Sequence, residues 1–245
     1  MKKGLSKKVV LVYNVKNTFV SKDIKLLEKI GFTVLLIHSP PYRDPFRFFY
    51  NRTKELVLSC FYLPISRGVF SWFNDYHTTI PVLMAKLFKK PITIIIGGYD
   101  AVANTRLNYG IFSKNNARQK LARWNLKRSH SIWVVHKTLS EGCSFAKEQT
   151  NTNSGIKNFV PDLSTPIKEI PTAYDSNFWK KENKKAPKSI LTVANIFDRR
   201  TFERKGIPIF FDLAERLPHF KFTLAGLKKK FFFGSIPKNV RILGE

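Results

Sequence analysis

Two short segments hold the residues whose types and spacing could support chemistry, and the first is Gly97-Gly98-Tyr99-Asp100. It follows directly after the apolar run Pro91 to Ile96. Paired glycines let a backbone pass close to a ligand, and an acidic and an aromatic side chain after a buried strand can project into a cleft. We therefore interpret this loop as ligand-binding. The alternative is a tight turn in which Asp100 caps the backbone.

The second segment runs from Asn195 to Gly206 and follows the apolar run ILTVA. It carries several basic side chains, and Lys205-Gly206 immediately precedes a predicted helix. A helix N-terminus has free amide groups and a positive dipole end, and both favour a phosphate. The sequence therefore predicts a phosphate-binding loop here. The alternative is a set of solvated loop charges.

Several familiar kinds of site are missing from the sequence. The first strand is followed by Tyr13-Asn-Val-Lys-Asn-Thr18, without the glycines of a dinucleotide-binding turn. No phosphate-binding P-loop and no GxSxG nucleophile turn occurs, and the five histidines lack the spacing of metal ligands. Cys60 and Cys143 stand in dissimilar surroundings, which suggests neither a disulfide framework nor a zinc site. We expect no metal and no dinucleotide cofactor.

The chain is strongly basic. Among its 245 residues, 43 are Lys or Arg and 17 are Asp or Glu, which gives a formal net charge of +26. Between Ala101 and Ser140 there is no acidic residue, so an anionic neighbour is expected there. Three alternatives are open: a helix face that contacts solvent alone, an acidic membrane or lipid phosphate, and nucleic acid. The eight cations of this segment are Arg106, Lys114, Arg118, Lys120, Arg123, Lys127, Arg128 and Lys137.

The elements that must position these residues alternate between strands and helices. Strands that are apolar on both faces, separated by helices of about 10 to 15 residues, are typical of a parallel sheet covered on both sides. We predict strands at residues 8–13, 33–38, 69–73, 91–96 and 132–135. We predict helices at residues 22–30, 76–88 and 114–127, with Asp75 capping the second, and a shorter helix near Thr138.

The pattern restarts after a polar, proline-containing stretch. We predict strands at residues 189–194, 219–225 and 240–243, with a helix at 207–217 between the first two. The fold class is therefore α/β, with two Rossmann-like doubly wound parallel-sheet domains, of which the second is incomplete. The expected divisions are residues 1–170 for the first domain, 171–188 for the linker and 189–245 for the start of the second.

Composition and hydropathy limit the class and location of the protein. Apolar residues make up 43% of the chain and aromatic residues 14%, which is too much for a disordered basic tail. The apolar run from Val9 to Tyr13 is shorter than an export signal requires, and no window resembles a membrane-spanning helix. We expect a cytoplasmic protein that also associates peripherally with the inner face of the cell membrane.

Five motifs in sequence order resemble a known enzyme family. They are GGYDA with the downstream Asn108-Tyr109-Gly110, the strand SIWVV, the segment EIPTAYDSNFW, the strand ILTVANI, and RKGIPIFFDLAERLPHFKFTLAG. In type and order they resemble the retaining glycosyltransferases of family 4, which have the two-Rossmann GT-B fold. The resemblance covers nearly the whole chain.

This resemblance implies roles for residues at both sites. Lys205 matches a lysine that contacts the donor diphosphate, and Asn195 lies where many members have an arginine with the same task. Arg204 or Arg199 could replace that arginine. Asp100, with Gly97, Gly98 and Tyr99, matches the loop that meets the transferred sugar and the acceptor, so Asp100 is the expected catalytic residue. Acceptor contacts from Asn14 to Thr18 are a further implication.

The implied activity is transfer of a sugar, with retention, from a nucleotide-sugar donor to a glycan or lipid-linked acceptor, without a metal. The family's paired glutamates would lie beyond Glu245, so we expect residues 1–245 to be inactive alone. Two other interpretations remain open. One is a basic α/β protein that binds nucleic acid or a membrane without catalysis, although nucleic-acid motifs are missing. The other is an inactive fragment that docks on a membrane or partner.

Overall fold

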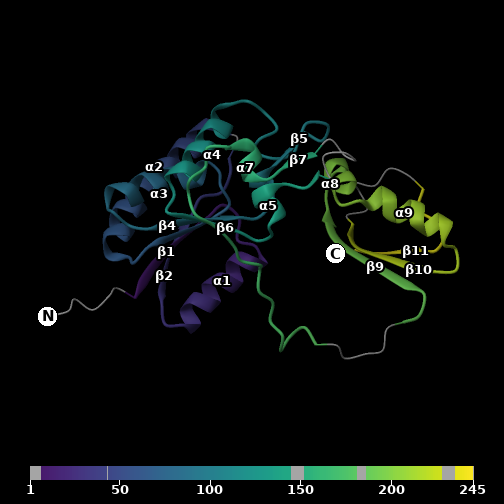
Figure 1. Ribbon diagram of the computed structural model, residues 1–245. Coiled ribbons are helices and arrows are strands. Elements are labelled where there is room, and N and C mark those ends of the chain that lie inside the picture. Colours follow the sequence, from purple (N-terminus) through teal and green to yellow (C-terminus); the bar gives the residue numbers. More distant parts are fainter. Residues whose placement is uncertain (1–6, 43, 145–151, 181–185, 228–234, 245) are drawn as a thin grey trace. The chain divides into compact units, whose positions relative to one another are not determined.

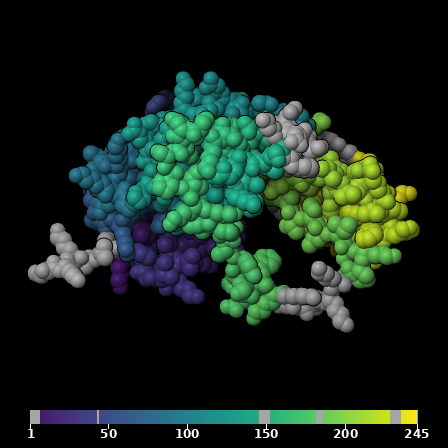
Figure 2. Space-filling model, viewed as in Figure 1, coloured from purple at the N-terminus to yellow at the C-terminus, as the bar shows by residue number. Residues whose placement is uncertain are grey.

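The computed structural model describes residues 7–42, 44–144, 152–180, 186–227 and 235–244. The chain divides into two compact units, residues 1–174 and 175–245. This division falls inside the segment predicted to be the linker, where residues 171–180 are all exposed (Figure 2). Both units have the α/β architecture expected from the sequence (Figure 1).

The first unit is built on a six-stranded sheet in the order β2-β1-β3-β4-β6-β8. Every neighbouring pair in this sheet is parallel, so the predicted parallel sheet is confirmed. The short strands β5 (Val102–Asn104) and β7 (Thr152–Ser154) form a separate antiparallel pair. The strands of the main sheet are β1 (Lys8–Tyr13), β2 (Thr33–His38), β3 (Val69–Trp72), β4 (Ile92–Ile96), β6 (Ser131–Val134) and β8 (Ile167–Glu169).

Alternate residues of each strand enter different cores, as a doubly wound sheet requires. Val10 and Val12 belong to the larger core, together with buried residues of α2, α3 and α4, whereas Leu11 and Tyr13 pack with α1. Figure 1 shows α2, α3 and α4 on one face of the sheet and α1 on the other. These helices are α1 (Thr18–Lys29), α2 (Pro45–Ile65), α3 (Tyr76–Leu87) and α4 (Ala117–Arg128).

Local capping explains where three predicted helices begin. Asn17 caps α1 by accepting from Val20 N, and Asn116 caps α4 by accepting from Gln119 N. The predicted cap of α3 is confirmed, because Asp75 accepts from Tyr76 N at 2.8 Å. The sequence pattern predicted no element over residues 45–65, where α2 forms with Asp44 as its cap. Two short helices follow, α5 (Thr138–Glu141) and α7 (Ile156–Phe159).

The second unit contains a parallel three-stranded sheet in the order β11-β10-β9. The predicted strands and helix are present, and Ile207, Phe210 and Phe211 pack onto the sheet. Strand β9 extends two residues beyond its predicted end. The elements are β9 (Ser189–Ile196), α8 (Arg199–Arg204), α9 (Ile207–Arg216), β10 (Lys221–Leu227) and β11 (Val240–Leu243).

The strand order of the first unit fixes where a ligand is expected. Strand β1 lies between β2 and β3. The chain passes from β1 to β2 on one side and then returns past β1 to β3 on the other, so the direction of strand order reverses here. In open α/β sheets, ligands bind outside the carboxyl ends of the strands at such a switch point. The loops after β1, β2 and β3 therefore define the place to examine.

Candidate functional site

A cleft of about 620 Å³, lined by both polar and apolar side chains, lies at this switch point. The loops after β1 and β2, the first turns of α2, the start of α3 and one residue of α4 form its walls. Its position is dictated by topology, because parallel strands present all their carboxyl ends at one edge. The lining residues that bear on its chemistry are Asn14, Ser39, Arg52, Asp75, His77 and Arg118.

Arg52 and Asn14 offer polar atoms that the protein itself does not use. Arg52 donates through Nη2 to the Ser39 hydroxyl at 2.5 Å. Its Nε and Nη1, together with Oδ1 of Asn14, are buried and have no hydrogen-bond partner among the described residues. Buried polar groups are normally paired. Two donors and an acceptor in one cleft fit a ligand that carries hydroxyl or phosphate oxygens.

Glu55 places a carboxyl group behind Arg52. Its Oε1 lies 2.7 Å from Nη2 of Arg52, and its side chain is almost wholly buried. Burial raises the pKa of Glu55 to about 7, against the opposing effects of Ser39 and Arg52. Burial also lowers the pKa of Arg52. The pair therefore presents the Arg52 cation to the cleft. Its counterion, the Glu55 carboxylate, is only partly ionised near neutral pH.

Asp75 and Arg118 form a two-point ion pair on the other side of the cleft. Arg118 Nε donates to Oδ1 of Asp75 at 2.7 Å, and Nη2 donates to Oδ2. Burial by itself would raise the pKa of Asp75, but the Arg118 guanidinium holds it below its ordinary value. Nη1 of Arg118 also donates to the Tyr99 hydroxyl at 3.0 Å. Asp75 is thus a structural carboxylate that joins α3 to α4.

His77 is a buried neutral imidazole in the wall of the cleft. Its Nε2 lies 2.9 Å from the Trp72 carbonyl oxygen. Because a carbonyl oxygen only accepts, Nε2 carries the proton and Nδ1 keeps its lone pair. Burial lowers the pKa of His77, so the ring is neutral at pH 7.

Asp100 does not project into a cleft, and the expectation that it does is wrong. Its side chain is 0% exposed. The carboxylate accepts from the backbone amides of Asn74, Gly97 and Gly98 at 2.9 to 3.1 Å. Burial raises its pKa to about 6, although these backbone donors oppose the rise. The geometry is that of the alternative, a capped turn, and it ties the loop after β4 to the loop after β3.

The neighbours of Asp100 also have structural explanations. A Cβ atom on Gly97 would lie 2.5 Å from the Phe73 ring, so close packing requires glycine there. Gly98 has a φ of +140°, a conformation that other residues rarely adopt. The ring of Tyr99 packs edge-on against Tyr109, and its hydroxyl group accepts from Arg118. Tyr99 thus connects this loop to the cleft through Arg118.

The predicted residues of the second unit lie close together in sequence around α8. Asn195 is exposed on β9, and Arg204 is the last residue of α8. Lys205 is exposed and forms the C-cap of α8. Gly206 follows in a left-handed conformation with φ of +69°, and α9 begins directly after it. The predicted position of Lys205 before a helix N-terminus is therefore correct, while its phosphate contact stays a prediction.

The basic segment from Ala101 to Ser140 contains no acidic residue, but in the folded structure acidic side chains from other segments contact it. Arg118 pairs with Asp75, and Lys127 pairs with Asp162 at 2.5 Å. Both carboxylates come from outside the segment. The reason is that neighbours in a folded chain are set by packing and not by sequence distance. The prediction of an unopposed block of eight charges is corrected accordingly.

A second cavity, of about 490 Å³, lies between α1 and the sheet. Its walls are mainly apolar, with Leu11, Trp72 and Trp133 among them, and it lies against a face of the sheet and not at the carboxyl ends of the strands.

Among the described residues, His, Cys, Asp and Glu form no group of three that could hold a metal ion. No described helix has the length and apolar character needed to cross a membrane.

The sequence patterns missed most of the cleft. Asn14 was an implied acceptor contact, but Arg52 and His77 carried no assigned role. Arg52 lies in a run of aromatic residues without a motif, and its buried partner Glu55 is three residues ahead. The one usable signal was this Arg-x-x-Glu pair within a segment rich in aromatic residues.

Comparisons with known proteins found similarity to solved structures only. No family model matches the chain, and no curated protein matches it. A solved structure, MurG from Acinetobacter baumannii, matches with a TM-score of 0.40 and 11% sequence identity. The match covers 97% of this chain and 65% of that one, so the chain spans about two thirds of the length of MurG.

Proposed function

We propose that this chain is a glycosyltransferase that binds a nucleotide sugar through its second unit and an acceptor in the cleft of its first unit. The observation that carries the proposal is the cleft at the switch point, with the unpartnered donors of Arg52 and the unpartnered acceptor of Asn14. Sugars and phosphates supply the oxygens that such groups bind.

We propose the following roles for the residues of the two units. Arg52 and Asn14 hold the acceptor, a glycan or a lipid-linked sugar. His77 contributes a neutral imidazole to the wall of the same cleft. Lys205, before α9, stabilises the negative charge of the departing diphosphate without a metal. The sugar is transferred with retention of its anomeric configuration. Asp100 supports the site by tying the loop after β4 to the loop after β3.

Donor binding provides the first test. Titration calorimetry with a panel of nucleoside-diphosphate sugars should find at least one that binds. Lys205→Ala should weaken this binding about tenfold or more, because a charge-assisted contact to phosphate is lost. Lys221→Ala is the matched control, since Lys221 is an exposed cation at the start of β10, whereas Lys205 follows the carboxyl end of β9. Equal effects of the two substitutions, or no donor at all, would contradict the proposal.

The acceptor side needs a separate assay. Release of nucleoside diphosphate is followed with glycan and lipid-extract acceptors, and Arg52→Gln should lower the acceptor-dependent rate about tenfold or more. Lys120→Gln, an exposed cation on α4 outside the cleft, should leave it unchanged. Thermal melting of each variant separates lost contacts from lost folding, and Asn14→Ala serves if Arg52→Gln does not fold. If neither Arg52→Gln nor Asn14→Ala changes the acceptor-dependent rate, the acceptor does not bind in this cleft.

A further inference from the structure

Helix α2 exposes most of its large apolar side chains, whereas three of its four buried residues are polar, which largely inverts the usual arrangement. Phe46 is 86% exposed, and Tyr50 and Phe61 are each 70% exposed. On the opposite side, a stripe of four residues at a spacing of four is buried, and only its last member is apolar: Asn51, Glu55, Ser59 and Leu63. A surface helix normally presents its apolar stripe to the core and its polar face to water. The outward face of α2 therefore has the composition of a surface that is covered in use.

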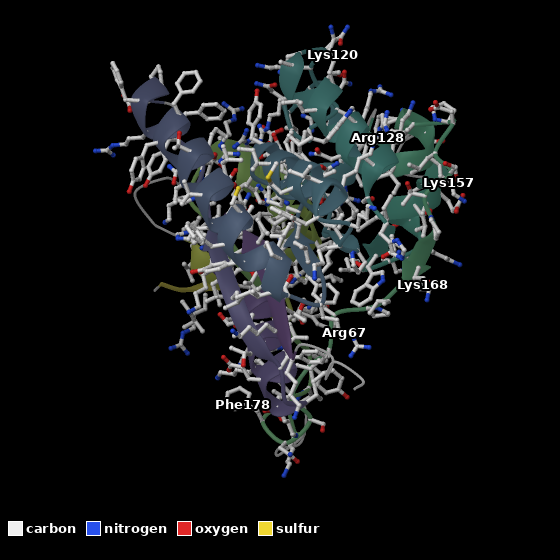
Figure 3. All side chains as sticks on the ribbon, turned by 90° about the vertical axis from the view of Figure 1, so that its left-hand side faces the viewer. Arg67, Lys120, Arg128, Lys157, Lys168 and Phe178 are labelled. Atoms are coloured by element: carbon white, nitrogen blue, oxygen red, sulfur yellow. The ribbon has the colours of Figure 1, made fainter. Side chains whose placement is uncertain are left out.

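This apolar face runs the length of the helix. With 21 residues, α2 is about 30 Å long. Figure 3 shows α2 along the side of the molecule turned toward the viewer. Continuous apolar patches of this kind mark protein or membrane contacts. The exposed apolar side chains that form the face are Phe46, Phe49, Tyr50, Leu56, Val57 and Phe61.

Charge identifies the occupant of this face. Glu55 is the only acidic residue between Pro45 and Ile65, and it is buried on the inward side. Arg47 and Lys54 are exposed on the same helix, and the whole chain carries a net charge of +26. A second copy of the chain would bring an equal positive charge to the contact. An anionic surface would be attracted by it.

We propose that α2 docks the first unit on the surface of an acidic lipid bilayer, with the helix lying in the plane of the interface. Phenylalanine and tyrosine rings insert between the head groups and the acyl chains, and Arg47 and Lys54 meet the lipid phosphates. The helix is not apolar enough to cross the membrane, so it lies on the bilayer. The proposal is independent of the glycosyltransferase assignment, because docking needs neither donor nor acceptor.

Vesicle flotation tests the apolar part of the contact. The full chain should bind vesicles of phosphatidylcholine with phosphatidylglycerol and bind weakly to phosphatidylcholine alone. Combined substitution of Phe46, Tyr50 and Phe61 by Ser should lower the partition coefficient about tenfold or more, because three rings no longer enter the interface. Ile209→Ser is the control, since Ile209 on α9 is similarly exposed. Thermal melting shows that each variant folds.

Two further measurements locate the contact. Lys54→Glu on α2 should weaken vesicle binding more than Lys120→Glu, which makes the same change of charge on α4, where Lys120 projects into solvent (Figure 3). Cys60 is exposed on α2, so an environment-sensitive fluorophore can be attached there in a Cys143→Ser variant. Its emission should shift to the blue when acidic vesicles are added.

Three results would overturn the proposal. The first is a triple serine variant that binds acidic vesicles as well as the wild type. The second is Lys120→Glu weakening binding more than Lys54→Glu, which would assign the membrane contact to the segment from Ala101 to Ser140. The third is an oligomer in analytical ultracentrifugation that the triple variant dissociates while vesicle binding is unchanged, which would make this face a contact between copies.

Discussion

At the cleft wall, burial shifts the pKa of Arg52 and of Glu55 behind it away from their ordinary values. Glu55 lies beneath Arg52, with its carboxylate 2.7 Å from the guanidinium. Burial raises its pKa from 4.5 to about 7. The cation in front of it keeps two donors free for a ligand. Protonation of Glu55 therefore couples the charge of the cleft wall to pH.

We expect Glu55 to make the protein less stable as the pH rises from 5 to 7.5. The unfolded chain releases this proton near pH 4.5, whereas the folded protein holds it to about pH 7. Between these values the folded state binds more protons, so the free energy of unfolding falls with rising pH. The contribution of Glu55 is about 2 to 3 kcal/mol. Urea unfolding at several pH values measures it.

Glu55→Gln isolates this effect from other titrating groups. Asp100 acts in the same direction as Glu55, and His77 acts in the opposite one because its pKa is lowered by burial. Both remain in the variant, so the difference between the two pH profiles belongs to Glu55. Glu28→Gln, at an exposed position of α1, is the matched control. Identical profiles for wild type and Glu55→Gln would disprove the assignment.

At the scale of elements, α2 serves two surfaces. Its inward side supplies Arg52 to the cleft, and its outward side is apolar. The same inversion explains why no helix was predicted over residues 45–65. A search for an apolar stripe facing a core fails when three of the four buried residues, Asn51, Glu55 and Ser59, are polar. Only packing against the sheet and α3 reveals which side of the helix is buried.

Two cations of α4 allow a comparison of ion pairs that connect elements. Arg118→Ala should lower the free energy of unfolding by about 2 to 4 kcal/mol, because it leaves the buried carboxylate of Asp75 without its partner. Lys127→Ala should cost much less, since the side chains of Lys127 and Asp162 are both exposed.

Arg118→Lys should fall between these values, because lysine keeps the charge but loses the second contact to Asp75. Urea unfolding of the three variants at pH 7 provides the measurement. If Arg118→Ala and Lys127→Ala cost the same, Asp75 does not depend on Arg118.

For the whole molecule, the separation of the cores is the main feature. One set of buried side chains packs on the two faces of the six-stranded sheet, and another packs on the three-stranded sheet. No residue belongs to a core cluster of both units among the described residues. Each unit therefore has the means to fold by itself.

We expect two transitions in differential scanning calorimetry, one for each unit. Limited trypsin digestion should cut after Lys180, because residues 171–180 are exposed throughout. A fragment of residues 1–174 should keep a cooperative melting transition of its own. A single transition for the chain, together with protection of Lys180, would show that the units fold as one.

The sequence by itself determined the alternation of strands and helices. Buried runs such as Pro91 to Ile96 read as strands wherever they stand, and local caps such as Asp75 fix the helix starts, because both signals depend on neighbouring residues alone. The division into two units was likewise visible in the polar stretch between them.

The tertiary structure alone decided which side chains meet. The cleft exists because β1 lies between β2 and β3, and strand order cannot be read from local patterns. Asp100 lies beside two glycines in the sequence, but the amide of Asn74, 26 residues away, helps turn its carboxylate inward. Arg118 likewise finds Asp75 only after α4 packs on α3. Such pairings arise from the packing of distant segments, which is why the site could not be assigned residue by residue beforehand.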